Sequence, residues 1–181
     1  DYVAVDSMYH QQYSLVQTVP GSWWHPENWQ TEYHIQNWNI INERPYVWAS
    51  FVWNMFDLGP AHRTEGDRPG INDKGLVTHD RKIKKDAYYF YRANWNPEPM
   101  IYIAGRRNVN RVKPLVDVQV FSNVEEVILI VNDCQCGKMK PDSLKVCLFK
   151  DVPLRKGRNE IEVRANDSKK QLIDRFAWIL Q

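Results

Sequence analysis

The apolar residues of this chain recur with two different periods, and the period changes at one place. Up to Trp95 the spacing is mostly that of helices, whereas after Pro99 apolar and polar residues alternate. Two prolines within residues 95–99 end a helix and stiffen the connection that follows. The pattern therefore predicts two domains, residues 1–96 with strands and helices and residues 97–181 with strands alone.

Two amphipathic helices are predicted in the first domain, after a loop-rich entry over residues 1–24. One helix opens at Pro26, which suits a first turn, and is stopped by Pro45. The other covers residues 81–94, where apolar residues share one face and three lysines point outward to solvent: Lys82, Lys84 and Lys85.

Between these helices lies an apolar run, residues 46–56, that holds only three polar side chains. It is rich in aromatic and β-branched residues, opens after a proline and closes at Gly59-Pro60, which predicts a strand buried on both faces. Its end brings a flat ring and polar groups together, in Trp53, Asn54 and Asp57. In barrels of alternating strands and helices, ligand sites are built at that end of the strands.

The second domain shows period-two alternation in short segments separated by turn residues. The predicted strands are Met100–Ala104, Leu115–Phe121, Val127–Val131, Val146–Phe149, Glu160–Ala165 and Leu172–Leu180. Pairs of residues that contain asparagine, aspartate or glycine lie between these strands, for example Asn132-Asp133 and Lys156-Gly157. This arrangement predicts a β-sandwich of immunoglobulin-like type.

Composition and charge exclude several kinds of partner. The net charge of +2 does not indicate nucleic acid, and no apolar run approaches the ~18 residues of a membrane span. Three cysteines, at positions 134, 136 and 147, lack the spacing of a zinc site, and the last histidine is His79. We assign no metal and no cofactor. At 181 residues the chain is also shorter than a whole (β/α)8 barrel of about 250 residues.

The motifs around the predicted strand are specific. Residues 51–57 read Phe-Val-Trp-Asn-Met-Phe-Asp, and residues 65–77 read Glu-Gly-Asp-Arg-Pro-Gly-Ile-Asn-Asp-Lys-Gly-Leu-Val. Together with residues 80–82 and 84–89, up to Trp95, they resemble the eighth strand, following loop and helix of glycoside hydrolase family 2, the β-galactosidase family. The resemblance implies an α/β plus all-β fold: the last β/α units of a TIM (β/α)8 barrel followed by the immunoglobulin-like sandwich.

The same resemblance implies retaining hydrolysis of a β-glycoside by two glutamates, a nucleophile and an acid/base. Alignment places Asp1 at the nucleophile, with a shorter carboxylate, and Val3 and Val5 where the family has glycine. The acid/base normally follows strand four, which this chain does not contain. We therefore expect the C-terminal portion of a hydrolase, inactive alone and active as part of a full-length chain.

Five further residues are implied in sugar binding. By resemblance, Trp53 stacks beneath the sugar, which suits an apolar ring face against C–H bonds. Asn54 and Asp57 either bind sugar hydroxyls or hold neighbouring side chains. Asn72 and Lys74 resemble an Asn-x-Lys pair with which β-glucuronidases of the family read the sugar carboxylate, a role suited to a lysine charge. Galactosidase-like members carry a similar Asn-Asp-Lys-Gly segment, so the sugar stays open.

The expected function is hydrolysis of terminal β-galactosides in carbohydrate metabolism. The alternatives are a β-glucuronidase-type member of the same family, and a non-catalytic carbohydrate-binding or degenerate module. The expected partners are a β-linked sugar and the remaining barrel upstream in the natural chain, without nucleic acid or membrane. A homo-oligomer and the compartment stay open, with a periplasmic or secreted bacterial enzyme favoured over a cytoplasmic one.

Overall fold

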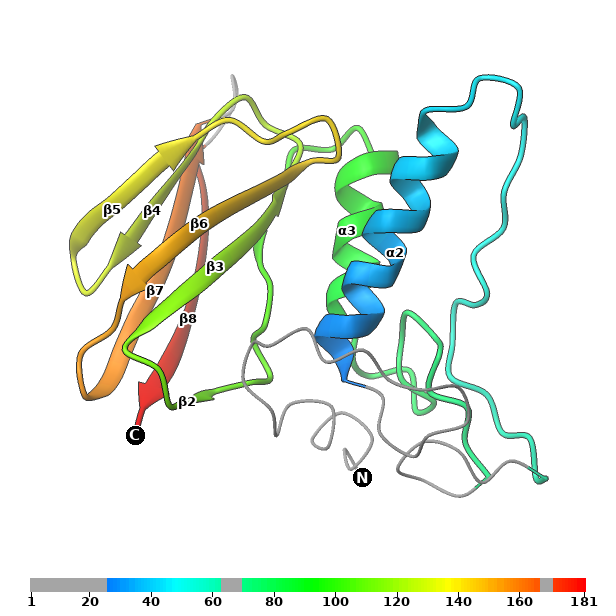
Figure 1. Cartoon of the computed structure of the whole chain (residues 1–181), viewed down its shortest axis with the longest axis horizontal. Helices are drawn as coiled ribbons and strands as arrows, with labels where there is room; N and C mark the ends of the chain where they lie inside the picture. The colour runs from blue at the N-terminus through cyan, green and yellow to red at the C-terminus, as the bar shows by residue number, and fades with distance from the viewer. Residues whose placement is uncertain (1–25, 63–69, 167–170) are drawn as a thin grey trace. The chain divides into compact units, whose positions relative to one another are not determined.

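The computed structural model describes residues 26–62, 70–166 and 171–181 (Figure 1). The chain divides into two compact units, Asp1–Tyr88 and Tyr89–Gln181. The domain boundary between residues 96 and 97 stays a prediction.

In the first unit, helix α2 (Glu27–Asn42) confirms the first predicted helix. Pro26 precedes it in an extended conformation, and its carbonyl oxygen accepts the N–H groups of Trp29 and Gln30. The helix ends at Glu43, whose N–H donates to the Asn39 carbonyl oxygen. Pro26 thus lies just before the first helical residue rather than within the first turn that the sequence predicts.

Residues 46–56 do not form the buried strand that their apolar run predicts. The side chains of Trp48 and Phe51 are both 95% exposed. Among the described residues, the one β-bridge of this segment joins Phe56 to Val77. A strand buried on both faces needs paired strands at its edges and covering layers on each side. The described residues supply neither, so the run forms no ladder.

Helix α3 (Asp86–Trp95) begins later than predicted. Arg81 has a φ of 63°, and Lys84 forms a β-bridge with Val77, so the segment before Asp86 is not helical. Lys82 and Lys84 are exposed as predicted. Lys85 is only 1% exposed, and its predicted place on the solvent face is wrong. Its ammonium group pairs with a buried carboxylate, which a helical projection of residues 81–94 does not show.

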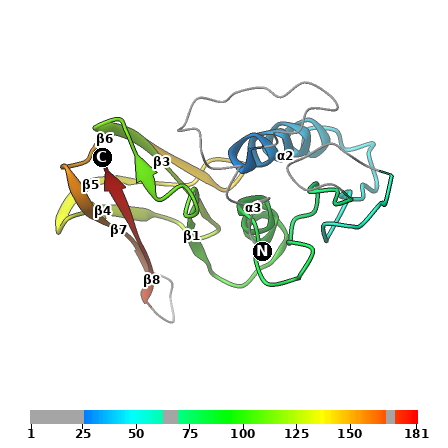
Figure 2. The same cartoon turned by 90° about the horizontal axis from the view of Figure 1, so that it is seen from below.

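In the second unit the described strands form two sheets, seen as two layers in Figures 1 and 2. The three-stranded sheet has the order β1-β3-β6, with β1 (Ile101–Ile103), β3 (Leu115–Ser122) and β6 (Val146–Pro153). The five-stranded sheet has the order β2-β8-β7-β4-β5, with β2 (Asn110–Arg111), β8 (Gln171–Leu180), β7 (Gly157–Asn166), β4 (Val127–Val131) and β5 (Cys134–Met139).

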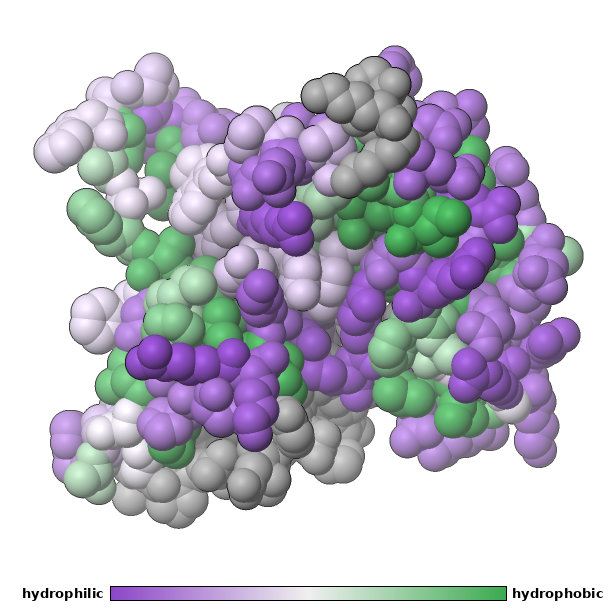
Figure 3. Space-filling view, turned by 180° about the vertical axis from the view of Figure 1, so that it is seen from behind, coloured by the Kyte–Doolittle hydropathy of each residue, from purple (hydrophilic) through white to green (hydrophobic). Residues whose placement is uncertain are grey.

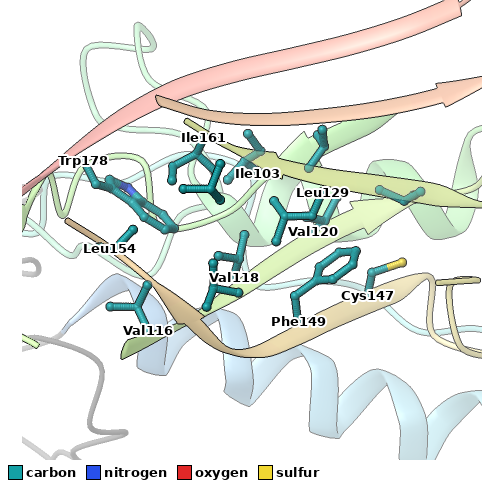
Figure 4. Close-up of a cluster of buried hydrophobic side chains, with 14 of the residues drawn as sticks. Ile103, Val116, Val118, Val120, Leu129, Cys147, Phe149, Leu154, Ile161 and Trp178 are labelled. Atoms are coloured by element: carbon teal, nitrogen blue, oxygen red, sulfur yellow. The ribbon is translucent and has the colours of Figure 1, made fainter. Parts of the chain in front are cut away.

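One hydrophobic core lies between these sheets (Figure 4). Inward-facing residues of both sheets are fully buried, among them Val118, Val120, Leu129, Ile161 and Trp178. Within the same unit, the ring of Phe90 in α3 contacts that of Phe121 edge-on. Alternation along strands such as β4 and β7 thus places one side in the core, as the sequence pattern predicts.

Each of the six predicted strands is present, β4 with the predicted ends and the other five with shifted ends, but β2 and β5 were not predicted. β5 lies at a sheet edge and its first three residues are exposed, so its sequence shows no alternation. It is joined to β4 by Asn132 and Asp133, both with positive φ angles of 50° and 66°. Such a two-residue turn is typical of a β-hairpin. The turn was visible in the sequence, but its second strand was not.

The surface of the chain carries apolar side chains at several places (Figure 3). Val112, Leu115 and Ile179 are each more than two-fifths exposed. None of the described helices is both long enough and apolar enough to cross a membrane. The three cysteines are free thiols, and burial raises the pKa of Cys147 to about 12.

Candidate functional site

Two segments of the first unit, residues 54–58 and 72–77, lie side by side. Backbone N–H groups donate to carbonyl oxygens across the pair, from Leu76 to Asn54, Val77 to Met55, Asp57 to Val77, Leu58 to Asn72 and Asn72 to Leu58. These bonds bring the backbones of the candidate residues together. They join the end of the apolar run to the loop that carries Lys74.

A buried ion pair fixes this arrangement. The Nζ of Lys85 lies 2.8 Å from Oδ1 of Asp57 and donates to the carbonyl oxygen of Asp73 at 2.6 Å. The side chains of Lys85 and Asp57 are 1% and 2% exposed. Burial raises the pKa of Asp57 above its ordinary value, and the Lys85 charge opposes that rise by stabilising the carboxylate. Neither charge can lose its partner without a large desolvation penalty.

Gly75 permits the close approach of the two segments. Its N–H donates to Oδ1 of Asp57 at 2.8 Å. A Cβ atom at Gly75 would lie 2.1 Å from the backbone nitrogen of Asp57 and 2.2 Å from the carbonyl carbon of Phe56. Side-chain carbons do not approach backbone atoms this closely. Glycine is therefore required here unless the loop moves.

The first turns of α2 supply two further contacts. Nε2 of Gln30 donates to the carbonyl oxygen of Gly75 at 3.1 Å. The fully buried Glu27 accepts the N–H of Asp86 through Oε1 at 2.6 Å, at the first residue of α3. The carboxylate thus satisfies one of the N–H groups that a helix start leaves without an intrahelical partner.

The six residues predicted for the site differ in their exposure to solvent, and one of them lies outside the described residues. Asp1 lies outside the described residues. The Trp53 side chain is 73% exposed, and the peptide bond that follows it is cis. Asn54 is half-buried, Asp57 and Asn72 are buried, and Lys74 is exposed. The structure brings Asn54, Asp57, Asn72 and Lys74 to one pair of segments, while their roles toward a ligand stay predictions.

Asn72 shapes the turn that presents Lys74. Its Oδ1 accepts the backbone N–H of Lys74 at 3.0 Å, a local bond typical of asparagine in turns. Asn72 is 6% exposed, whereas Lys74 is open to solvent. Of the two residues, Lys74 is the one that is exposed to solvent.

Sequence reasoning missed three residues of this cluster, Glu27, Gly75 and Lys85. The run of lysines before α3 indicated a solvated face, and the position of Glu27 at a helix start did not indicate a tertiary contact. One signal was available for Lys85, because an aspartate at the end of an apolar run calls for a buried cation nearby. Nothing in the sequence pointed to which lysine would supply it.

The described residues offer no cluster of three or more histidine, cysteine, aspartate or glutamate side chains that could hold a metal ion. The buried carboxylates Asp57 and Glu27 are instead occupied by Lys85 and by the backbone.

His34 of α2 is expected to make the first unit sensitive to mild acid. It is 8% exposed, and burial, with a smaller effect of the Lys85 charge, lowers its pKa from 6.5 to about 4. The unfolded chain therefore binds a proton below pH 6.5 that the folded chain takes up only near pH 4. Stability should fall as the pH drops from 6.5 to 4, by about 3 kcal/mol, and level off below.

The measurement is the unfolding free energy as a function of pH for the wild type and for His34→Gln. The variant should lose that part of the pH dependence. His79→Gln serves as the control, because His79 is exposed. An unchanged pH profile in His34→Gln would contradict the assignment.

Comparison with known proteins shows that the chain is similar to parts of glycosidases. No protein-family model matches it. Its curated relatives are named β-glucuronidase or putative β-glucuronidase, and the similar solved structures include β-glucuronidases and a protein described as a "putative beta-galactosidase".

Three of these proteins show how far the similarity extends. The chain is 57% identical over 175 residues to a β-glucuronidase of Bacteroides fragilis, which covers 96% of this chain and 25% of the relative. The "putative beta-galactosidase" of Bacteroides fragilis has a TM-score of 0.89 at 34% identity, over 96% of this chain and 26% of that one. The FMN-binding β-glucuronidase of Facaelibacterium prausnitzii has a TM-score of 0.82 at 37% identity, over 93% and 25%.

The chain thus spans about a quarter of the length of these glycosidases. The similarity extends through both units, because more than nine-tenths of the chain is covered in each case.

Proposed function

We propose that this chain is part of a retaining β-glycosidase that hydrolyses β-glucuronides. The sequence alone favoured β-galactosides and kept glucuronides as the alternative. The curated relatives, two named β-glucuronidase and two putative β-glucuronidase, support the alternative as the substrate class.

One observation on this chain carries the proposal. The exposed Lys74 stands on a loop whose backbone is held by Asn72, Lys85 and Asp57. A lysine held at a fixed backbone position can offer its charge to an anionic group of the sugar without ordering the loop on binding. A glucuronide has a carboxylate at C6, whereas a galactoside has a neutral hydroxymethyl group there.

The other site residues take the roles that the resemblance implies. Trp53 offers its exposed ring to the face of the sugar, while Asn54 and the buried Asp57 hold the loop. Asp1 stands at the nucleophile position by alignment alone. In retaining hydrolysis the nucleophile and the acid/base are about 5 Å apart, and we expect the acid/base from sequence upstream.

The proposal includes a fold. Residues 1–96 would contribute the last β/α units of a (β/α)8 barrel completed by upstream sequence, and residues 97–181 an immunoglobulin-like sandwich. The exposed aromatic side chains of residues 46–56 support it, because barrel strands on either side would cover them.

The test uses the longest natural chain that the gene encodes, assayed on nitrophenyl β-glucuronide and nitrophenyl β-galactoside. The wild type should cleave the glucuronide. Lys74→Met should lower kcat/KM on the glucuronide by roughly tenfold to 10²-fold, because a hydrogen bond to a charged group is lost, and leave the galactoside rate nearly unchanged.

The control is Lys82→Met, since Lys82 is an exposed lysine of the same region. If Lys74→Met lost kcat/KM equally on both sugars, this would contradict recognition of the sugar carboxylate by Lys74. A wild type that cleaves neither sugar would favour the non-catalytic or degenerate module.

A β-galactoside remains the second candidate, favoured by one structural neighbour. The "putative beta-galactosidase" of Bacteroides fragilis matches this chain with a TM-score of 0.89. A wild type that prefers the galactoside in the same assay would select this candidate.

A further inference from the structure

We propose that Lys85 is a positioning residue that sets where Lys74 stands in the candidate site. The inference rests on the proposed function and adds to it a residue that determines sugar specificity. Lys85 is 1% exposed, so it does not meet a ligand itself. It acts through Asp73, the residue between Asn72 and Lys74.

The contact is made at the peptide unit of Lys74. The carbonyl oxygen of Asp73 accepts a hydrogen bond from Nζ of Lys85 at 2.6 Å, and the N–H of Lys74 donates to Oδ1 of Asn72 at 3.0 Å. Carbonyl and N–H belong to one planar peptide unit. Side chains therefore hold that plane at both ends, and a shift at either end moves the Lys74 backbone.

Lys85 also couples this peptide unit to the opposite segment. Its Nζ lies 2.8 Å from Oδ1 of Asp57, and the same oxygen accepts the N–H of Gly75 at 2.8 Å. One ammonium group thus spans the two segments, with Asp57 balancing its charge. A lysine suits this place because its compact ammonium group carries three donors that can turn toward different acceptors. The donors of arginine are instead fixed within one planar guanidinium group.

The loop depends on these side chains because it has little ladder of its own. Around the turn, Asn72 and Val77 form isolated β-bridges with Leu58 and Phe56. Between them, residues 73–75 are held by Lys85, Asn72, Asp57 and Gln30. Loss of the Lys85 contact should therefore release the peptide that carries Lys74 rather than the whole segment.

The test separates positioning from stability by removing both charges together. Asp57→Asn/Lys85→Met leaves neither charge of this pair buried without its partner and keeps an acceptor for the Gly75 N–H. It removes the 2.6 Å ammonium donor to the Asp73 carbonyl oxygen and leaves only the longer contact from Nε2 of Gln30, at 3.5 Å. The matched control is Asp80→Asn/Lys82→Met, which neutralises an exposed pair of the same region, 3.6 Å apart. Both are made in the longest natural chain, with and without Lys74→Met.

The readout is the ratio of kcat/KM on nitrophenyl β-glucuronide to that on nitrophenyl β-galactoside. Asp57→Asn/Lys85→Met should lower this ratio by about tenfold to 10²-fold, since a displacement near 1 Å can have such an effect. Adding Lys74→Met should lower it little further, because both changes remove the same contact. The control pair should leave the ratio unchanged. A loss that is equal on both sugars would show a structural role alone and overturn the proposal.

A crystal structure of Asp57→Asn/Lys85→Met tests the positioning without any activity. A displaced Asp73–Lys74 peptide supports it, and an unmoved peptide overturns it even where the enzyme is active. Failure of the proposed function has a different signature, namely a wild type that cleaves neither sugar or a Lys74→Met variant with an unchanged ratio. In that case the proposed role of Lys85 in sugar specificity is also excluded.

Discussion

Replacing Lys85 by methionine is expected to destabilise the first unit by about 3–5 kcal/mol, because it leaves the carboxylate of Asp57 buried without its cation. The Lys85 side chain is 1% exposed and its Nζ is 2.8 Å from Oδ1 of Asp57. Methionine matches the length of the lysine stem, so the effect comes from the lost charge and donors. The loss is measured by denaturant titration, with hydrogen exchange at Gly75, Leu76 and Asp86 to assign it to this unit.

The charge-balanced variant Asp57→Asn/Lys85→Met provides the internal comparison. It should be clearly more stable than Lys85→Met, because a neutral pair carries no uncompensated charge. Lys82→Met should change stability by no more than about 0.5 kcal/mol, as exposed ion pairs contribute little. A Lys85→Met variant as stable as the wild type would mean that Asp57 is not held ionised by this contact.

The Trp178→Ala variant is expected to lose about 3–5 kcal/mol of unfolding free energy in the second unit. Trp178 is fully buried in the core between the sheets, and no other fully buried side chain described is larger. The guanidinium carbon of Arg111 lies 3.9 Å from its ring centroid, and Arg111 is itself 1% exposed. Truncation therefore leaves a cavity and also removes the ring that the buried cation faces.

The neighbouring Ile179→Ala is the matched control. Ile179 is the next residue of β8 but is 41% exposed on the opposite side of the sheet, so its loss should amount to less than about 1 kcal/mol. Hydrogen exchange in β7 and β8, which are paired along their whole length, assigns the change to the second unit. Comparable losses in the two variants would contradict the location of the core.

The elements that could be predicted from the sequence are those whose pattern depends on local neighbours. The α2 helix followed from its opening proline and apolar spacing, and the alternating strands such as β4 and β7 followed from their buried faces. By contrast, β2 has two residues and β5 lies at an edge with exposed side chains, so neither leaves a periodic signal.

The apolar run of residues 46–56 shows a second limit. Its composition indicated a buried strand, but burial depends on partners that the described residues do not provide. Trp48 is 95% exposed for this reason. A sequence pattern specifies what a segment needs, whereas the structure shows whether this chain supplies it.

In the candidate site, the motif residues were identifiable and their scaffold was not. Asn72 and Lys74 were found through the resemblance. Lys85, Glu27 and Gly75 act through tertiary contacts over long sequence separations, such as that between Asp57 and Lys85. Neither the periodicity of the sequence nor a short motif indicates which residues form such pairs.

The exposure of Trp48 and Trp53 has a spectroscopic consequence. These indole rings are 95% and 73% exposed, whereas that of Trp178 is completely buried. Exposed indoles emit at longer wavelength than buried ones and are quenched by small solutes. Among the eight tryptophans of the chain, Trp48 and Trp53 thus act as optical reporters: whatever covers residues 46–56 would shift their emission to shorter wavelength, whereas that of Trp178 would stay unchanged.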